Sequence, residues 1–365
     1  MRNLKIVHID SENTWRGGQK QVIELVRGLE NLGQKNCIVF RPQSEIAKKA
    51  RENGFKYLEL PLKSEIDFGS AIKLRSFIKK NRIDIVHAHS SHAHTIALMS
   101  LLGINSCKLV VSRRVDFHLS GYLSVKYKYN GRVDKIITVS DAIKRILIED
   151  GVIPEKIVTI RSGFIPGAFE NEMSYNRDLR KEYEIDDNTL VVSTVAALAP
   201  HKAHNVLLKA ANIVLKKNKN VKFLIAGEGE MRTSIEKDIY NFGLKDSVIL
   251  LGFVKNIGPV YKASDIFAIS SEEEGLCTSL FDAMYHKLPI VATSAGGIPE
   301  IVQDCINGYI VPVNDFITFA DRLNTLIENK EKRLKMGERT TTILEQNKIE
   351  KTVEKTLAVY RELWN

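Results

Sequence analysis

Two acidic residues, Glu274 and Asp282, are the first candidates for chemistry in this sequence. Glu274 begins a glycine-containing loop after the apolar run DIFAIS, and Asp282 comes eight positions later, on the helix that the pattern predicts next. Carboxylates accept hydrogen bonds from paired hydroxyl groups such as those of sugars and ribose. Backbone N–H groups at the start of such a helix suit a phosphate. The alternative is that the acidic cluster 272–274 only decorates a helix N-terminus.

A glycine pair, Gly17 and Gly18, lies between the first predicted strand and the first predicted helix. Glycine lets the backbone approach a diphosphate closely at a helix N-terminus. A plain tight turn is the alternative interpretation. The run GEGE at 227–230 is a weaker signal, because the third glycine and the spacing of a dinucleotide-binding fingerprint are missing.

A run of histidines and a pair of arginines follow two further predicted strands. The run HAHSSHAH (87–94) is one place to look for a metal site, but no cysteine or carboxylate set lies nearby. His87 and His89 point the same way if the strand continues, so we expect one of them to line a substrate-binding site. The run SRRVDFH follows the strand KLVVS and contributes three more polar candidates: Arg113, Arg114 and Asp116. Arginine is a natural contact for an anion.

Length and composition set the broad class. A chain of 365 residues predicts two domains, and 44% hydrophobic with 27% charged residues is ordinary for a soluble globular protein, which excludes disordered and fibrous classes. The nearly uncharged stretch 90–105 is too short and too polar for a membrane span, and MRNLKIVHID lacks a signal-peptide core. The four cysteines are scattered, which argues against a disulfide framework or a zinc site and fits a reducing cytosol.

Charge is distributed unevenly along the chain. Residues 1–165 hold 28 basic and 16 acidic residues, a net charge of +12, whereas residues 166–365 hold 25 and 28, a net charge of −3. One half is therefore expected to face something anionic, such as a phospholipid surface, a charged substrate or nucleic acid. A solvated basic surface is the alternative. No recognised nucleic-acid module accompanies the charge, so we expect no nucleic-acid partner.

Strands alternate with helices through both halves. The first half contains the apolar runs LKIVHI, NCIVF, IDIVHAH, KLVVS, KIITVS and KIVTI, and the second contains LVVSTVA, VKFLIAG, VILLG, DIFAIS, PIVAT and GYIVP. Such alternation predicts doubly wound parallel sheets. The pattern pauses around a proline-containing, charged stretch. We therefore expect a Rossmann-like domain at 1–165, a linker at 166–187, a second domain at 188–345 and a C-terminal helix at 346–365 that packs back on the first domain.

The longest motif resembles a known family. The run SSEEEGLCTSLFDAMYHKLPIVATSAGGIPEIV (270–302) closely resembles the donor-binding signature of the family-4 retaining glycosyltransferases. The resemblance continues through FLIAGEGEMRTSIEKDIYNFGLKDSVILLGFVKNIGPVYKASD, NGYIVP, RGGQKQVIELVRGLENLG, DIVHAHS and KIITVSDAIKRIL, in the family's order. It implies the GT-B fold, in which two Rossmann-like domains face a cleft and the donor binds mainly to the second.

The resemblance also implies residue roles. Glu274 matches the glutamate that contacts donor-sugar hydroxyls, and Lys202 matches the lysine that neutralises the diphosphate. Asp282 stands where the family usually has a ribose-binding glutamate. The loop backbone faces sugar and diphosphate at Gly275, Leu276 and Cys277, and the base is met at Phe253 and Val254.

The sequence departs from the family at two positions where relatives usually carry a particular basic residue. The family often has Gly-Arg-Leu before the lysine, and the matching residues here are Ala196, Ala197 and Leu198. Arg232, just after GEGE, is one candidate to replace the missing arginine, and a solvent-facing helix arginine is the alternative for it. Many relatives have a histidine near Arg114, so the arginine pair and Asp116 stand where sugar and acceptor should meet.

The sequence therefore predicts a retaining glycosyltransferase that uses a nucleotide-diphosphate sugar and needs no metal ion. By analogy its acceptor is a glycan or a lipid-linked sugar in bacterial cell-surface polysaccharide or lipopolysaccharide synthesis. The expected location is the cytoplasm, with peripheral contact to the inner face of the membrane. Two alternatives stay open: a nucleotide-sugar epimerase or hydrolase of the same fold, and a non-catalytic scaffold.

Overall fold

The computed structural model describes residues 3–119, 121–122, 124–167, 170 and 176–364. The chain forms two compact units, one made of residues 1–163 and 349–365 and the other of residues 164–348. Part of the stretch 166–187, which the sequence analysis expects to be a linker, lies outside the described residues. The helix α6 (Leu179–Glu182) in the same stretch belongs to the second unit.

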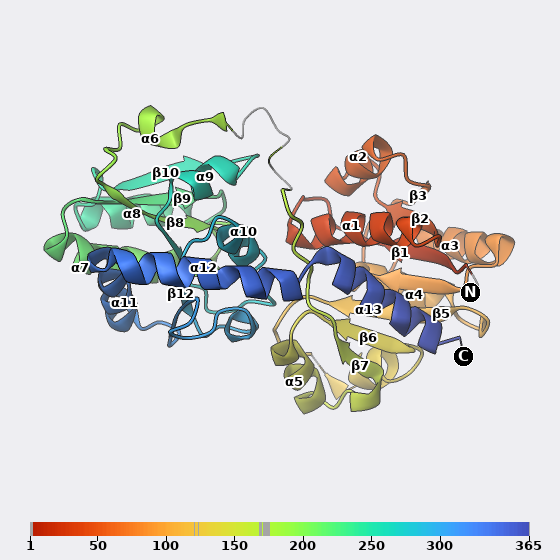
Figure 1. Cartoon of the computed structure of the whole chain (residues 1–365). Coiled ribbons are helices and arrows are strands. Elements are labelled where there is room, and N and C mark those ends of the chain that lie inside the picture. Colours follow the sequence, from red (N-terminus) through yellow and green to blue (C-terminus); the bar gives the residue numbers. More distant parts are fainter. Residues whose placement is uncertain (1–2, 120, 123, 168–169, 171–175, 365) are drawn as a thin grey trace. The chain divides into compact units, whose positions relative to one another are not determined.

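The first unit is a parallel sheet with helices between successive strands (Figure 1). Within the described residues its strand order is β3-β2-β1-β4-β5-β6-β7, and every pair is parallel. In chain order the elements are β1 (Lys5–Ile9), α1 (Gly17–Asn31), β2 (Lys35–Phe40), α2 (Glu45–Glu52), β3 (Tyr57–Glu59), α3 (Phe68–Asn81), β4 (Ile85–Ala88), α4 (Ser91–Ser100), β5 (Lys108–Arg113), the π-helix η1 (Ser124–Tyr129), β6 (Lys135–Thr138), α5 (Asp141–Glu149), η2 (Pro154–Lys156) and β7 (Ile157–Thr159).

The last helix, α13 (Ile349–Glu362), belongs to this first unit and packs against α1. Figure 1 shows the two helices side by side. The contact is close, because a Cβ added to Gly28 of α1 would lie 2.5 Å from Cγ2 of Val353. A side chain larger than hydrogen at Gly28 would therefore force the helices apart.

The second unit repeats the same architecture. Its described strands follow the order β10-β9-β8-β11-β12-β13, again all parallel. After α6 come β8 (Leu190–Val195), η4 (Pro200–Lys202), α7 (His204–Lys217), β9 (Val221–Ala226), α8 (Arg232–Asn241), β10 (Val248–Gly252), α9 (Gly258–Ala263), β11 (Ile266–Ile269), α10 (Ser279–Tyr285), β12 (Ile290–Thr293), η5 (Ile298–Glu300), β13 (Gly308–Val311), α11 (Phe316–Glu328) and α12 (Lys330–Gln346).

Both sheets confirm the predicted doubly wound fold. The central strands β4 and β11 are buried along their whole length, as strands of a parallel sheet covered on both faces should be. Each sheet reverses its strand order at its middle, beside β1 in the first unit and β8 in the second. In open α/β sheets ligands bind at the carboxyl ends of the strands near such a reversal, so the loops after these strands are where a site belongs.

Candidate functional site

An ion pair joins the two most informative residues of the second unit. The Nζ of Lys202 lies 2.5 Å from Oε1 of Glu274, and the Oγ of Ser271 donates to the same oxygen at 2.9 Å. The pair is largely buried, with side chains 17% and 7% exposed. A cation and a carboxylate that the sequence places 72 residues apart therefore meet, at the ends of β8 and β11.

Backbone contacts hold the loops that carry this pair. The Oγ of Ser270 donates to the carbonyl oxygens of Lys202 and Ala203, at 3.1 and 3.0 Å. Ala203 adopts a left-handed backbone with φ of 45°, which is uncommon for a residue with a side chain. The N–H of Gly297 donates to the carbonyl oxygen of Glu274 at 3.1 Å, so the glycine loop after β12 supports the same glutamate.

The residues after Glu274 form a tight, buried turn. Leu276 and Cys277 are buried, and Cys277 has a φ of 52°. Burial, with a further contribution from the Glu274 carboxylate, raises the pKa of the Cys277 thiol, so it stays a neutral thiol at ordinary pH. Asp282 lies on α10, half-buried, near Tyr261, and the pKa of that phenol is raised chiefly by burial and further by Asp282.

The loop after β9 packs on the loop after β8. A Cβ added to Gly227 would lie 1.8 Å from the carbonyl oxygen of Ala196, and the N–H of Leu198 donates to the carbonyl oxygen of Glu228 at 3.0 Å. Gly227 also has a φ of 154°. The GEGE run is therefore a close backbone junction.

Arg232 begins α8 beside this junction, but carboxylates already hold its guanidinium. It pairs with Glu228 at 2.5 Å and with Glu236 at 2.9 Å. The Phe253 side chain is 74% exposed, whereas Val254 packs against the core. Arg232 also lies near Gly252, because a Cβ added to Gly252 would be 3.8 Å from its NH1 group. Gly252 directly precedes Phe253 and Val254, the two residues expected to contact the nucleotide base.

In the first unit the glycine pair forms the start of α1. Gly17 and Gly18 are its first residues, and within the described chain the N-cap residue Arg16 makes no capping side-chain bond. Arg114 packs on this turn, because a Cβ added to Gly18 would lie 3.4 Å from Cδ of Arg114. Burial lowers the pKa of Arg114 to about 10, opposed by the nearby Asp10 carboxylate, so the guanidinium remains charged at neutral pH. This turn therefore combines backbone N–H groups with a fixed cation, which suits an anion.

His8, His87 and His89 form a buried cluster on β1 and the end of β4. The ring nitrogens of His8 pair with Nε2 of His89 at 3.0 Å and with Oδ1 of Asn36 at 3.2 Å. Those of His87 pair with the hydroxyls of Tyr360 at 2.6 Å and Ser112 at 2.8 Å. Hydrogen bonds thus use both nitrogens of His87, while Nδ1 of His89 has no partner within the described part of the chain.

Burial keeps this cluster uncharged. It lowers the pKa of His8 to about 4 and those of His87 and His89 well below the usual value. The Nδ2 of Asn36 donates to the carbonyl of Gln34, which leaves its oxygen facing His8. His8 therefore carries its proton on Nε2, and its Nδ1 accepts a hydrogen bond from Nε2 of His89. Because His89 is neutral, its Nδ1 carries no proton and is a buried hydrogen-bond acceptor.

Arg113 turns into the protein. Its NH2 group donates to the carbonyl oxygen of Phe117 at 2.6 Å, and its guanidinium lies 4.8 Å from the centre of the Phe117 ring. Arg113 thus orders the loop that carries Arg114 and Asp116. The Asp116 side chain is half-buried.

Comparisons with known proteins agree with this geometry. The family model described as "Glycosyltransferase Family 4" matches residues 15–166, and the one described as "Glycosyl transferases group 1" matches residues 176–342. The two models together cover most of the chain, one on each unit. The chain belongs to the family-4 type of glycosyltransferases.

Named relatives span most of this glycosyltransferase. N-acetyl-alpha-D-glucosaminyl L-malate synthase of Bacillus anthracis is 25% identical over 81% of this chain and 79% of its own length. UDP-Gal:alpha-D-GlcNAc-diphosphoundecaprenol alpha-1,3-galactosyltransferase of Escherichia coli is 25% identical over 81% and 80%. The crystal structure of Anabaena Alr3699/HepE with UDP and glucose has the same fold, with a TM-score of 0.85 and 19% identity over 99% of this chain and all of that one.

Sequence reasoning missed several residues that build the glycosyltransferase site. Ser270 and Ser271 directly follow β11, and that position is the signal that could have found them. Asp10 follows β1 in the same way; it accepts from the N–H of Glu12 at 2.8 Å and from Nε2 of Gln19 at 3.1 Å. Burial raises the pKa of Asp10. The partners of His8 lie on other strands and could not be deduced from spacing.

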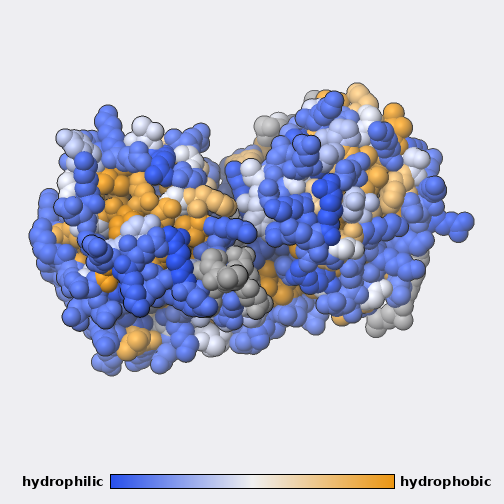
Figure 2. All heavy atoms as spheres, turned by 90° about the horizontal axis from the view of Figure 1, so that it is seen from above, coloured by the Kyte–Doolittle hydropathy of each residue, from blue (hydrophilic) through white to orange (hydrophobic). Residues whose placement is uncertain are grey.

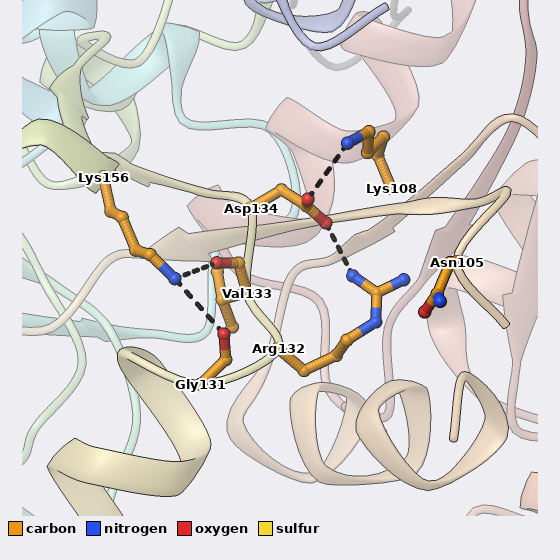
Figure 3. Close-up of a pocket in the computed structure, with 7 residues that line it drawn as sticks. All are labelled: Asn105, Lys108, Gly131, Arg132, Val133, Asp134 and Lys156. Carbon is orange, nitrogen blue, oxygen red and sulfur yellow. Dashed lines mark hydrogen bonds and ion pairs between the residues drawn. The ribbon is translucent and has the colours of Figure 1, made fainter. Parts of the chain in front are cut away.

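A cavity of about 390 Å³ lies elsewhere in the first unit (Figure 3). It is lined at the amino ends of β5, β6 and β7, whereas the candidate site residues follow the carboxyl ends. Its cations are occupied: Lys156 donates to three main-chain carbonyls, and Arg132 and Lys108 pair with Asp134 at 2.7 and 3.5 Å. These contacts tie neighbouring strands together, which explains the cluster without a ligand.

Proposed function

We propose that this enzyme transfers a sugar from a nucleoside-diphosphate sugar with retention of configuration at the anomeric carbon. The Lys202–Glu274 pair carries the proposal, since it places one cation and one hydroxyl acceptor side by side where three loops meet. A donor offers the matching groups, a diphosphate for the lysine and sugar hydroxyls for the glutamate. The UDP and glucose named with the Anabaena structure support this donor class.

The remaining donor contacts follow from position. Asp282 would accept from the ribose hydroxyls, and the backbone of Gly275, Leu276 and Cys277 would face the sugar and the diphosphate. The loop at Phe253 and Val254, where Phe253 is exposed, would contact the nucleotide base. We assign Arg232 no direct phosphate contact, because two glutamates already neutralise it.

The first unit also contains groups that suit an anion. As the sugar–oxygen bond breaks, negative charge grows on the diphosphate, and cations and N–H groups fixed in advance stabilise that charge. Arg114 and the N–H groups of Gly17 and Gly18 meet this requirement together. We propose that fixed cations and N–H groups of this kind take the place of a metal ion, and that the leaving phosphate takes the acceptor proton on the same face.

The acceptor side is assigned to residues after β4 and β5. The unpartnered Nδ1 of His89 suits an acceptor hydroxyl, while both nitrogens of His87 are already bonded, so we give His87 a supporting role. Arg113 and Asp116 would shape the same loop. The name of the Escherichia coli relative includes a diphosphoundecaprenol acceptor, which favours a lipid-linked glycan and bacterial cell-surface synthesis.

A peripheral contact with anionic membranes fits such an acceptor. None of the helices in the described ranges is long and apolar enough to cross a bilayer. Large apolar side chains do reach solvent on the first unit, among hydrophilic neighbours (Figure 2). Phe68 on α3 and Tyr127 on η1 are 68% and 64% exposed, and Lys126 lies over the Tyr127 ring at 5.4 Å.

A two-step experiment tests the proposed function. Thermal shifts with UDP, GDP and their sugars identify the nucleotide, because a ligand that binds only the folded state raises the melting temperature. The purified enzyme is then incubated with the matching labelled sugar donor and with lipid-linked or free glycans. Label that moves to an acceptor supports the transferase. Release of free sugar alone would favour a hydrolase, isomerised donor an epimerase, and no binding a scaffold.

A further inference from the structure

The point where the chain leaves the first unit is held by one side chain of α1. Gly163, the last residue before the second unit, bonds through both its backbone groups to Gln21. Its N–H donates to Oε1 at 2.8 Å, and Nε2 donates to its carbonyl oxygen at 2.7 Å. Gln21 is only 5% exposed. The side-chain amide thus pairs with the exit backbone as a neighbouring strand would.

The returning chain packs at the same point. A Cβ added to Gly163 would lie 2.4 Å from Cα of Ile349, the first residue after the second unit. The Oγ1 of Thr352 donates to the carbonyl oxygen of Arg161 at 2.9 Å. Both passages of the chain are therefore fixed within the first unit, and Gln21 connects the outgoing passage to α1 by two side-chain hydrogen bonds.

Gln21 lies one helical turn after the glycine pair at the start of α1. Gln21 follows Gly17 by four residues, so the two lie on one face about 6 Å apart along the helix axis. Further along, Gly28 packs against Val353 of α13. The helix is thus held in its first turns by the exit backbone and in its middle by the returning helix.

We propose that Gln21 is a positioning residue that sets the place of the Gly17–Gly18 N–H groups relative to the exit of the chain at Gly163. The inference rests on the proposed function, in which those N–H groups face the diphosphate. A small displacement of groups that stabilise developing charge lowers the rate more than it lowers ground-state binding. If Gln21 had only a structural role, replacing it would lower stability and leave the catalytic rate unchanged.

The test compares Gln21→Met with Thr352→Val in the full chain. Methionine keeps the length of the side chain and removes both hydrogen bonds, while valine removes one hydrogen bond at the same crossing, from Thr352 on α13 to the carbonyl oxygen of Arg161. We expect similar losses of melting temperature in both variants. Only Gln21→Met should lower kcat, by about tenfold or more, while Kd for UDP changes by less than about twofold. Wild-type kcat in Gln21→Met, or an equal loss in Thr352→Val, would overturn the proposal.

Hydrogen exchange gives a readout that needs no activity. Amides of residues 17–24 should exchange faster in Gln21→Met than in wild type, and those residues should be unaffected in Thr352→Val. Unchanged exchange at the start of α1 would overturn the positioning role even if kcat fell. If the wild-type protein transfers no sugar, the proposed function fails, and the exchange comparison still decides whether Gln21 positions α1.

Discussion

At the scale of single residues, Lys202 and Glu274 pair with each other in this structure and are both proposed to contact the donor. Each residue neutralises the other, at 2.5 Å and largely out of water. A donor would take over both charges, the diphosphate pairing with Lys202 and the sugar hydroxyls with Glu274. Substitution of either residue therefore affects stability as well as catalysis, and the two effects must be measured separately.

Lys202→Met should lower kcat/KM about 100-fold or more, because a fixed cation facing a developing phosphate charge contributes several kcal/mol. It should also cost about 3 kcal/mol of stability, since the buried carboxylate of Glu274 loses its cation. Steady-state kinetics well below the melting temperature separates the two effects. Lys216→Met, on the exposed side of α7, is the matched control and should change neither. Near-normal turnover in folded Lys202→Met would disprove the phosphate role.

Asp282→Asn should weaken binding of the free nucleotide by roughly 1–3 kcal/mol, the usual cost of hydrogen bonds lost from a charged acceptor. Asp282→Glu restores the residue that relatives usually carry and should bind at least as well as wild type. Isothermal titration with UDP measures both. Binding of UDP to Asp282→Asn with unchanged Kd would mean that another residue holds the ribose.

At the scale of elements, periodicity was enough to predict most of the fold. The C-terminal helix expected at 346–365 is α13, Ile349–Glu362. The strand DIFAIS is β11. The aromatic and basic run SVKYKY could be predicted as a helix but not as the π-helix η1, because residue types and spacing do not specify the wider hydrogen-bond pattern.

The site was predictable only as separate loops. Topology requires the loops after parallel strands to meet at one edge of the sheet, so the meeting of Lys202 and Glu274 follows from the fold. Their direct pairing, the support from Ser271 and the contacts of His8 depend on packing between distant segments. Spacing along the chain carries no information about such contacts.

Gly227→Ala should disrupt the junction between the loops after β8 and β9. The new Cβ would lie 1.8 Å from the carbonyl oxygen of Ala196, so backbone must move, and the φ of 154° disfavours any side chain. We expect about 2 kcal/mol or more of destabilisation and weaker binding of UDP. Gly69→Ala, in the first turn of α3, is the control because its Cβ would only touch Asp67 at 3.5 Å. Equal melting temperatures for the two variants would contradict the prediction.

The buried histidines of β1 and β4 should make the first unit acid-sensitive. The folded-state pKa of His8 is about 4, below its ordinary value near 6.5, so between these values the unfolded chain binds a proton that the folded chain does not. The free energy of unfolding should therefore be fully present above pH 6.5 and fall as pH decreases toward 4, by about 3 kcal/mol for His8 alone. His87 and His89 add to the same slope.

Tryptophan fluorescence in urea measures this slope selectively. The two tryptophans, Trp15 and Trp364, both belong to the first unit. His8→Gln should flatten the dependence on pH between 6.5 and 4, while His92→Gln, on the exposed side of α4, should leave it unchanged. A wild-type midpoint that is constant over this range would show that the cluster protonates without cost.

At the scale of the whole molecule, the first 165 residues carry a net charge of +12 and the rest −3. Not every cation in the first part is available to a membrane. Lys128 pairs with Glu65 at 2.6 Å, and Arg132 pairs with Asp134 at the amino ends of the strands. Lys126 lies over the exposed Tyr127 ring, and Phe68 is exposed on α3, the helix that begins just after Glu65. The ion pair thus brings the two segments close to each other.

The last prediction is that the full chain binds anionic vesicles through this region. Lys126→Gln combined with Phe68→Ser should weaken co-sedimentation about tenfold or more, since a cation near an anionic leaflet contributes about 1 kcal/mol and a buried phenyl ring more. Added salt should weaken binding, because it screens the charges. The second unit offers a control in Lys245→Gln with Tyr240→Ser, which likewise removes one exposed lysine and one exposed aromatic side chain. Equal binding to neutral and anionic vesicles, or an equal loss in the control, would assign the excess charge of the first unit to an ordinary solvated surface.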